Sequence, residues 1–406
     1  MAEQCLGCYA TTLRSLINLG QQPPSNRFLA KRGEACEVHP LELLICDTCG
    51  LGQLSKPIAP SVVRSRFDWI TYNEPEGHLD NLVDLLVASS QLSTQTKIVG
   101  ITYKDDSTLA RFHEKGIADT YRLKQEADLR IDVSLASLET IQQVLTPELA
   151  EHIASKIGQA DILMVRHILE HAHHPSRLLD ACNRLCKPGG LMVFEVPDCR
   201  KVLEGHDHCF LWEEHISYFT PDTLRTFILA NGYAETDMKI YPYPMEDSLV
   251  AIVRNVRSSP IGTGAHVDSE LARLGGFAGS LHARGRDIKA YLEALQTAGK
   301  HVALFGAGHL AAKFINFYDL ADYLVGVIDD NPNKLGRLMP GSNLPIIGSG
   351  CLETGDVDLC LLTLNPESEQ KVRKAKADYL ARGGQFRSIF SASPSSIYKD
   401  IEHDRA

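Results

Sequence analysis

Long apolar runs and an excess of basic residues are both missing from this chain of 406 residues. Crossing a bilayer takes roughly 20 consecutive apolar residues, and no stretch of the sequence approaches that length. The N-terminus has no basic start followed by an apolar run, so it lacks the form of a secretion signal. A formal net charge of −10 leaves no basic stripe for phosphates. We therefore expect a cytoplasmic protein with no membrane and no nucleic-acid partner, and the sequence gives no indication of oligomeric state.

Paired cysteines are scarce outside the N-terminal region. The chain has 11 cysteines, and an odd number without a secretion signal argues against a disulfide framework. Four of them form two Cys-x-x-Cys pairs, Cys5 with Cys8 and Cys46 with Cys49. Two tight turns that each carry two thiolates are typical of a closed tetrahedral zinc site. A segment too small to bury much core also needs such a staple, so we expect these four cysteines to bind a structural zinc ion.

Helical and extended patterns alternate over the rest of the chain, which predicts parallel sheets covered on both faces. Helices are expected at 79–92, 147–156, 178–185, 269–297 and 310–317, and strands at 41–45, 97–101, 161–165, 191–196, 301–305, 323–328 and 359–364. Serine, proline and glycine residues near 258–264 form a linker. The sequence thus predicts an α/β protein with a small zinc-binding module at 1–60, followed by two Rossmann-like α/β domains at 61–257 and 258–406.

Polar residues follow the expected strand at 161–165. The segment from Arg166 to His171 contains two histidines and a glutamate. Ligands of open parallel sheets bind at the carboxyl ends of strands, so this segment is expected at a functional site, with His171 as its main candidate. His173 and His174, just beyond it, are more simply interpreted as solvated loop residues.

A glycine-rich loop follows the expected strand at 301–305. It reads Gly-Ala-Gly-His-Leu-Ala from Gly306, with Gly308 as its second glycine, and it opens a helix as a dinucleotide-binding turn does. Asp329 and Asp330 end the next strand, where an acid that binds ribose would lie. The loop would equally serve to close over a nucleotide-linked substrate, or be a structural turn. Three basic residues are candidates for contacting a pyrophosphate: Lys313, Lys334 and Arg337.

Short motifs follow one another in a defined order along nearly the whole chain. They are the cysteine pairs, Leu-Gly-Gln-Gln-Pro at 19–23, Pro-Leu-Glu-Leu at 40–43, Cys-Gly-Leu-Gly-Gln-Leu at 49–54, Leu-Glu-His at 169–171, Glu-His-Ile-Ser-Tyr-Phe-Thr-Pro at 214–221, Gly-Arg-Leu-Met-Pro-Gly at 336–341 and Leu-Pro-Ile at 344–346. In this order the chain resembles the sugar C-methyltransferases, which add a methyl group to a 4-keto deoxysugar carried on a nucleotide. The resemblance implies a zinc module, a class I methyltransferase domain that uses S-adenosylmethionine, and a C-terminal Rossmann-like domain.

The resemblance also implies catalytic residues. In the family reaction a proton beside the ketone leaves, and the enolate carbon attacks the sulfonium methyl. A histidine suits the base, because its pKa lies near neutrality, and a donor must stabilise the oxyanion. By position, His171 and the pair Glu214-His215 match catalytic residues of the family. Tyr72 matches its N-terminal tyrosine, with His78 as a rival that would contact the substrate.

The expected cofactor loop departs from the family pattern, which is acidic-x-Gly-x-x-x-Gly. Gly100 stands at the acidic position, and Thr102 and Asp106 replace glycines whose bare backbone would approach the cofactor. Asp105 matches the family, whereas Trp212 stands where the family usually has a tyrosine. The candidates for binding the cofactor are Gly100, Thr102, Asp105, Asp106 and His167, and Asp132 is a weak candidate for holding its ribose.

Three functions remain open on the sequence. The first is C-methylation of a nucleotide-linked keto sugar with S-adenosylmethionine as donor, His171 or His215 as base and Glu214 orienting the base. The second is an NAD(P)-dependent oxidoreductase or isomerase that uses the loop at Gly306 on a nucleotide-sugar. The third is a binding partner that kept the architecture and lost the cofactor.

Overall fold

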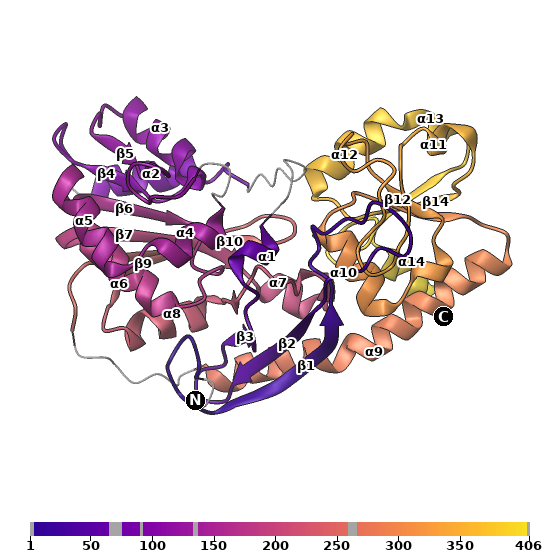
Figure 1. Ribbon diagram of the computed structural model, residues 1–406, viewed down its shortest axis with the longest axis horizontal. Coiled ribbons are helices and arrows are strands. Elements are labelled where there is room, and N and C mark those ends of the chain that lie inside the picture. Colours follow the sequence, from indigo (N-terminus) through magenta and orange to yellow (C-terminus); the bar gives the residue numbers. More distant parts are fainter. Residues whose placement is uncertain (1–3, 65–74, 90–91, 133–136, 259–265, 404–406) are drawn as a thin grey trace.

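The described residues form three β-sheets, and the long helix α9 (Val267–Thr297) contacts strand β1 (Leu13–Gln22) of the first and leads into strand β11 (Val302–Phe305) of the third. The computed structural model describes residues 4–64, 75–89, 92–132, 137–258 and 266–403. The sheet of the middle region lies at the left of Figure 1 in magenta, and the C-terminal sheet lies at the right in yellow and orange. The N-terminal strands, in indigo, lie between and below them beside helix α9 (Val267–Thr297). The predicted α/β class with two Rossmann-like sheets is confirmed.

The N-terminal sheet is antiparallel and has the order β1-β2-β3-β8. Its elements are β1 (Leu13–Gln22), β2 (His39–Cys46), β3 (Gly52–Leu54), β8 (Ser217–Tyr218) and the short helix α1 (Pro60–Val63). Leu41, Leu43 and Ile45 alternate along β2 and are all buried, as the two-residue period of a strand predicts. Strand β8 comes from the middle of the chain and pairs with β3, with Gln53 opposite Ser217. This pairing holds the segment just before β8 against the N-terminal module.

The middle sheet has the order β5-β4-β6-β7-β10-β9, in which β10 runs antiparallel to both neighbours. Its strands are β4 (Ile98–Gly100), β5 (Thr120–Arg122), β6 (Ala160–Arg166), β7 (Cys186–Asp198), β9 (Glu235–Tyr241) and β10 (Asp247–Arg254). Its helices are α2 (Leu79–Ser89), α3 (Asp106–Glu114), α4 (Leu138–Val144), α5 (Pro147–Ile157), α6 (Pro175–Leu185), α7 (Arg200–Glu204) and α8 (Pro221–Ala230), with 3-10 turns η1 (Tyr103–Asp105) and η3 (His208–Phe210). The chain leaves β4 toward β5 on one side and β6 toward β7 on the other. The switch point between β4 and β6 is where ligands of such sheets bind.

The C-terminal sheet is parallel throughout and has the order β13-β12-β11-β14-β15. Its elements are β11 (Val302–Phe305), β12 (Gly326–Ile328), β13 (Ile346–Ile347), β14 (Leu359–Leu362), β15 (Gln385–Ser388), α10 (His309–Tyr318), η4 (Ala321–Tyr323), α11 (Cys351–Thr354), α12 (Pro366–Ala375), α13 (Ala377–Ala381) and α14 (Ile397–His403). Helix α9 leads into this sheet after packing on the second cysteine turn. A Cβ on Gly50 would lie 2.4 Å from Cβ of Glu270, so the close approach of α9 requires glycine there.

Most predicted elements form, with shifted ends. The helix predicted at 178–185 begins earlier, at Pro175, because proline at the first helical position needs no hydrogen-bond donor. The strand predicted at 191–196 extends from Cys186 to Asp198, since Gly189 and Gly190 form backbone hydrogen bonds with Asn255 rather than a free turn. The strand predicted at 323–328 is shorter: Tyr323 ends the turn η4, and the strand begins at Gly326. No helix within the described residues is long and apolar enough to span a membrane.

Candidate active site and zinc centre

The four paired cysteines converge on one point in the N-terminal module. Their sulfur atoms all lie within 4.8 Å of one another, with 3.5 Å between Cys5 and Cys49 and 3.7 Å between Cys8 and Cys46. A tetrahedral zinc ion with bonds of about 2.3 Å needs sulfurs about 3.8 Å apart. All 11 cysteines lie in the described residues and none forms a disulfide. The set fits a closed structural zinc site, as the sequence predicts.

The crevice at the carboxyl ends of β4 and β6 is closed by a carboxylate. Asp105 accepts hydrogen bonds from the backbone N–H groups of Ile101 at 2.7 Å, Thr102 at 2.9 Å and Arg166 at 3.2 Å. Burial raises the pKa of Asp105 to about 7, although these donors and the Arg166 charge oppose the effect. Gly100 makes room for this arrangement, because a Cβ there would lie 2.6 Å from Cβ of Asp105. One side chain therefore takes the N–H groups at both strand ends that a ligand would otherwise meet.

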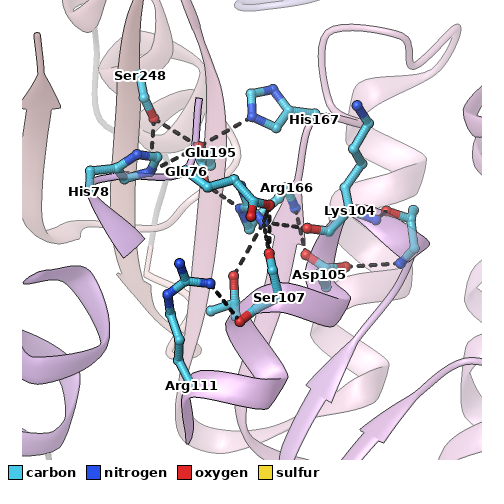
Figure 2. A network of polar contacts seen from close by, with 12 residues as sticks. Glu76, His78, Lys104, Asp105, Ser107, Arg111, Arg166, His167, Glu195 and Ser248 are labelled. Atoms are coloured by element: carbon cyan, nitrogen blue, oxygen red, sulfur yellow. Dashed lines mark hydrogen bonds and ion pairs between the residues drawn. The ribbon is translucent and has the colours of Figure 1, made fainter. Parts of the chain in front are cut away.

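Arg166 ties the loop after β4 to the neighbouring strands (Figure 2). Its buried guanidinium lies 2.5 Å from Oε2 of Glu195 and 3.5 Å from Oε1 of Glu76. It also donates to the carbonyl of Lys104 and, at 3.4 Å, to the hydroxyl of Ser107. Burial opposes the charged form, but Glu195 outweighs it and raises the pKa of Arg166. Arg166, the first residue of the predicted polar segment, is thus part of a charged internal network.

Glu195 on β7 joins two of the predicted histidines to this network. Its Oε1 accepts a hydrogen bond from Ser248 at 2.8 Å, and lies 3.1 Å from Nε2 of His78 and 3.2 Å from Nε2 of His167. Burial would raise the pKa of Glu195, but the two histidines and Arg166 hold it well below its usual range. His167 has φ of 50°, a left-handed conformation that non-glycine residues seldom adopt and that often marks a functional position. His78 therefore lies inside the network that Figure 2 shows.

A cavity of about 210 Å³ lies beside this closed crevice. The N-terminal module, the middle region and the C-terminal region all line this cavity. Six of its lining residues are Asn26, Tyr103, Lys104, Glu139, Glu246 and His309. Sites for drug-sized ligands span about 300–1,000 Å³, so the volume that the described residues enclose is below that range. Residues 65–74 and 133–136 neighbour the lining in sequence and lie outside the described residues.

Two carboxyl groups and two histidines face one another in this cavity. Nδ1 of His171 lies 3.1 Å from Oε1 of Glu139, and the ring of His171 meets the ring of His215 edge-on with centroids 4.8 Å apart. Burial raises the pKa of Glu214 well above its ordinary value, and the adjacent Glu139 adds to the effect. Burial acts on Glu139 too, but His171 outweighs it and lowers the pKa of Glu139 to about 2. The pKa values of the two carboxyls are therefore shifted in opposite directions, and burial holds the pKa of His215 well below its ordinary value.

The same cluster has the residue types of a divalent metal site. One oxygen each from Glu139 and Glu214 and one nitrogen of His171 lie within 4.8 Å of one another. Glu170, His171 and His215 form a second such set. Mixed imidazole and carboxylate ligands suit first-row transition metals, so these are the described residues outside the cysteine cluster that could hold a metal.

The glycine loop of the C-terminal region leads into α10, whose first two residues, His309 and Leu310, line the cavity. His309, the first residue of α10, stacks on Trp212 with ring centroids 4.1 Å apart, and burial lowers the pKa of His309 to about 4. Gly306 has φ of 103°, and a Cβ there would lie 2.7 Å from the side chain of Leu364. Gly308 precedes α10 and has open space where a Cβ would stand. The loop thus places one helix N-terminus and one aromatic ring at the cavity wall.

The other residues predicted to contact a pyrophosphate or ribose are engaged elsewhere. Oδ2 of Asp329 accepts hydrogen bonds from the N–H of Ala307 at 3.0 Å and from Nζ of Lys334 at 2.8 Å. Arg337 donates to the carbonyl of Asn333 at 2.7 Å. Asp329, Lys334 and Arg337 do not line the cavity. These contacts favour a structural role for the three side chains over contact with a ligand there.

Several predicted cofactor residues form helix caps. Thr102 accepts a backbone N–H in a capping box, and Asp106 begins α3 and lies 2.7 Å from Nε of Arg122. Asp132 is exposed. Tyr72 lies outside the described residues. Of the predicted catalytic set, the structure therefore brings together His171, Glu214 and His215.

Sequence reasoning did not single out the cavity residues Asn26 and Glu246. A further residue that it missed is Glu139. It lies in the first turn of α4, after the capping residue Ser137, in a segment without a family motif. Its approach to His171 depends on how α4 packs against the loop after β6. Trp212 stood out only as a departure from the family pattern, and His309 only as part of the glycine loop.

Three described protein families match successive parts of the chain. A putative zinc-binding domain matches residues 5–63, a methyltransferase domain matches residues 49–236, and a C-methyltransferase C-terminal domain matches residues 265–390. The chain is 22% identical to the C-methyltransferase NovU of Streptomyces niveus, over 95% of this chain and 94% of that protein. It is 29% identical to the ubiquinone biosynthesis O-methyltransferase of Roseobacter denitrificans, over 22% of this chain and 40% of that protein.

Similar solved structures include two methyltransferases. The 1,6-didemethyltoxoflavin-N1-methyltransferase of Burkholderia thailandensis is 15% identical, with 44% of this chain and 78% of that chain covered and a TM-score of 0.30. The magnesium protoporphyrin IX methyltransferase of Synechocystis is 12% identical, with 50% and 99% covered and a TM-score of 0.31. Both scores are too low to compare sites. The order of the three matched domains and the full-length likeness to NovU instead carry the assignment: the chain has the architecture of a C-methyltransferase, with an N-terminal zinc-binding domain, a methyltransferase domain and a C-methyltransferase C-terminal domain.

Proposed function

We propose that this chain transfers a methyl group to the carbon beside the ketone of a nucleotide-linked deoxysugar. One observation carries the proposal: a single cavity receives His171, Glu214 and His215, and its wall is completed by residues of the N-terminal module and by the start of α10 after the glycine loop. C-methylation beside a ketone requires a base for the carbon-bound proton and a donor for the enolate oxygen. The cavity offers both kinds of group.

The protein side chains divide this work between proton removal and charge stabilisation. His171 takes the proton from the carbon, the C–H electron pair becomes the enolate, and the negative charge develops on the ketone oxygen. Glu214, which keeps its proton because of burial and Glu139, donates a hydrogen bond to that oxygen. His215 lies beside His171 and its neutral ring is a second donor to the same charge.

The cavity fits S-adenosylmethionine better than the crevice does. The crevice offers no glycine cradle, since Asp105 takes its N–H groups. The cavity carries the carboxylates Glu139 and Glu246, which suit a sulfonium and an ammonium group, and Lys104, which suits a carboxylate. When bound, the cofactor supplies an electrophilic methyl group. Tyr103 and Lys104 of the loop after β4 are the residues that would hold it.

The nucleotide end of the substrate is assigned to the C-terminal side of the cavity. The N-terminus of α10 and the stacked pair of Trp212 and His309 form that wall. Helix N-termini favour anions through their oriented N–H groups. Gly306 and Gly308 would serve the substrate by shaping this turn.

The test is a methyl-transfer assay with the full chain. Isotope-labelled S-adenosylmethionine is incubated with a panel of nucleoside-diphosphate 4-keto-6-deoxyhexoses, and products are analysed for one added methyl on carbon. We expect label in one sugar, with at least about a hundredfold loss in His171→Asn and no loss in His113→Asn, an exposed histidine on α3. Label on oxygen or nitrogen only, or equal activity in both variants, would refute the proposal.

The NAD(P) alternative makes a different prediction. The acid that would hold ribose, Asp329, already accepts hydrogen bonds from Ala307 and Lys334, which disfavours dinucleotide binding. Thermal-shift titration separates the alternatives: stabilisation by S-adenosylhomocysteine supports methyl transfer, stabilisation by NAD(P) supports the oxidoreductase, and stabilisation by neither supports a binding partner without cofactor.

A further inference from the structure

The turn η1, which carries Tyr103 and Lys104 to the cavity, is held by one buried arginine. Arg166 is 0% exposed and does not line the cavity that Tyr103 and Lys104 line. Its Nη1 donates a hydrogen bond to the carbonyl of Lys104, and its backbone N–H donates to Oδ1 of Asp105 at 3.2 Å. Arg166 therefore fixes two consecutive residues of the turn, one through its side chain and one through its main chain (Figure 2).

The guanidinium of Arg166 is itself anchored on strand β7. Its Nε lies 2.5 Å from Oε2 of Glu195, and both side chains are 0% exposed. Arg166 and Glu195 are also opposite one another in the pairing of β6 with β7, so the anchor belongs to the centre of the sheet. The planar fork of arginine directs separate nitrogens to a carboxylate and a carbonyl at the same time, whereas lysine presents a single nitrogen. The arginine thus connects the turn to the sheet.

Stability alone is a poor reason to bury this arginine. Removing an ion pair from water often costs more free energy than the attraction between the charges returns. Nη2 of Arg166 is buried and has no hydrogen-bond partner within the described residues, which adds to that cost. An apolar side chain of similar volume would fill such a place with less penalty. A buried arginine that holds a cavity-lining turn is better explained by the geometry that it gives to that turn.

The backbone of the loop after β4 is held by opposite charges on its two kinds of polar group. Asp105 accepts the N–H groups of Ile101 at 2.7 Å and Thr102 at 2.9 Å, whereas Arg166 donates to the carbonyl of Lys104. A loop that is already fixed in one conformation loses less conformational entropy when a ligand binds to it. The contacts therefore prepare the loop for a ligand in the cavity.

We propose that Arg166 is a positioning residue for the methyl donor, because it fixes the turn so that Tyr103 and Lys104 face the cavity before S-adenosylmethionine binds. The proposal rests on the proposed function for the identity of the ligand, whereas the rigidity of the turn depends on no ligand. Arg166 touches neither the donor nor the substrate. Its loss should therefore weaken donor binding and leave the rate of the methyl-transfer step nearly unchanged.

Amide hydrogen exchange of the full, zinc-loaded chain tests the rigidity of the turn. Arg166→Lys keeps a cation beside Glu195, but its single nitrogen cannot reach the carbonyl of Lys104 as well. Because one hydrogen bond is lost, we expect the amides of residues 101–105 to exchange about three- to tenfold faster, without a change in β7. Glu195→Gln keeps an oxygen for Nε and loses the charge, so it should give a smaller increase. This second variant decides the question if Arg166→Lys does not fold.

Arg111→Lys is the matched control on α3. Arg111 also joins a carboxylate to a main-chain carbonyl, with 2.8 Å from Nε to Oδ1 of Asp80 and 3.0 Å from Nη1 to the carbonyl of Ser107. It does not line the cavity. The exchange of residues 101–105 should therefore be the same in Arg111→Lys as in the wild type.

Isothermal titration with S-adenosylhomocysteine tests the consequence for the ligand. We expect Arg166→Lys to bind it about three- to tenfold more weakly than the wild type, because the turn must then be ordered on binding. Arg111→Lys should bind it as the wild type does. Where activity is found, KM for S-adenosylmethionine should rise by the same factor in Arg166→Lys, while kcat changes by less than about twofold.

The outcomes separate this proposal from the proposed function. Unchanged exchange at residues 101–105 in folded Arg166→Lys overturns the positioning role, and so does an affinity for S-adenosylhomocysteine equal to that of the wild type. An equal loss of affinity in Arg111→Lys overturns it too, since the effect would then not be specific to the turn. If the wild type binds no S-adenosylhomocysteine, the proposed function is refuted. Faster exchange in Arg166→Lys would in that case reduce the contact to a structural one and overturn its role in donor binding.

Discussion

A buried ion pair joins all three parts of the chain beside the cavity, and its removal has a calculable cost. Nζ of Lys313 on α10 lies 2.7 Å from Oε2 of Glu213, and both side chains are at most 2% exposed. Glu213 also accepts the N–H of Ser25 at 2.5 Å, and Lys313 donates to the carbonyl of Pro23 at 3.2 Å. Removing one member leaves an uncompensated buried charge, which costs about 3–5 kcal/mol. Lys313→Met should lower the free energy of unfolding by that amount.

The direction of the pKa shift of Glu213 determines how the Lys313→Met penalty depends on pH. Burial alone would raise the pKa of Glu213, but Lys313 outweighs it and lowers the pKa. The wild-type pair therefore contributes stability that is fully present above the unfolded pKa and is lost as pH falls through the lowered folded value. In Lys313→Met the orphaned Glu213 can take up a proton, so the penalty of the variant should shrink from about pH 7.5 to about pH 5.

Urea unfolding at the two pH values measures these effects. Glu213→Gln combined with Lys313→Met removes both charges and should recover more than about half of the single-variant loss. Lys289→Met, which breaks the exposed pair with Asp319, is the matched control and should change stability by less than about 1 kcal/mol. A Lys313→Met penalty below about 1 kcal/mol, or one that grows as pH falls, would refute the reasoning.

Three further perturbations test other parts of the structure. Cys46→Ser should abolish binding of one zinc per chain, measured by elemental analysis, and lower the unfolding temperature, because structural zinc contributes folding free energy directly, whereas Cys36→Ser should retain the metal. Gly100→Ala should cost about 1–3 kcal/mol in urea unfolding, since its Cβ would lie 2.6 Å from Cβ of Asp105; Gly275→Ala, which meets no atom within 4 Å on α9, should instead gain about 0.5–1 kcal/mol. Because burial raises the pKa of Asp105 to about 7, its contribution to stability is present at acid pH and is lost as pH rises toward 7. The stability of Asp105→Asn relative to the wild type should therefore increase as pH rises toward 7. A difference in stability that does not change with pH would contradict this.

The sequence predicts the architecture well where one rule decides each element. The run Ile162 to Val165 is apolar and short, and it forms a strand buried on both faces. The two cysteine pairs predict a zinc site because few other arrangements place four thiolates together. Thr146 and Pro147 begin α5 as a capping residue and a first-turn proline should.

The site is less predictable, because it depends on contacts between distant segments. Strand β8 has two residues and pairs with β3, more than 150 positions earlier in the chain, and no local pattern indicates that pairing. It places His215 opposite His171, while α4 brings Glu139 to the same point. The arrangement around Asp105 was equally hidden. Gly100 leaves room for Asp105, and its carboxylate accepts the N–H groups of Ile101 and Arg166, which only the packed strands reveal.

Isothermal titration of the full chain with S-adenosylhomocysteine measures whether the cofactor binds in the cavity beside β4 and β6. We expect one saturable site per chain, with affinity about tenfold weaker in Lys104→Met, a change of about 1.4 kcal/mol, and unaltered in Glu148→Gln. The absence of any heat of binding, or equal affinity in both variants, would contradict the claim that the cavity beside the closed crevice receives the methyl donor.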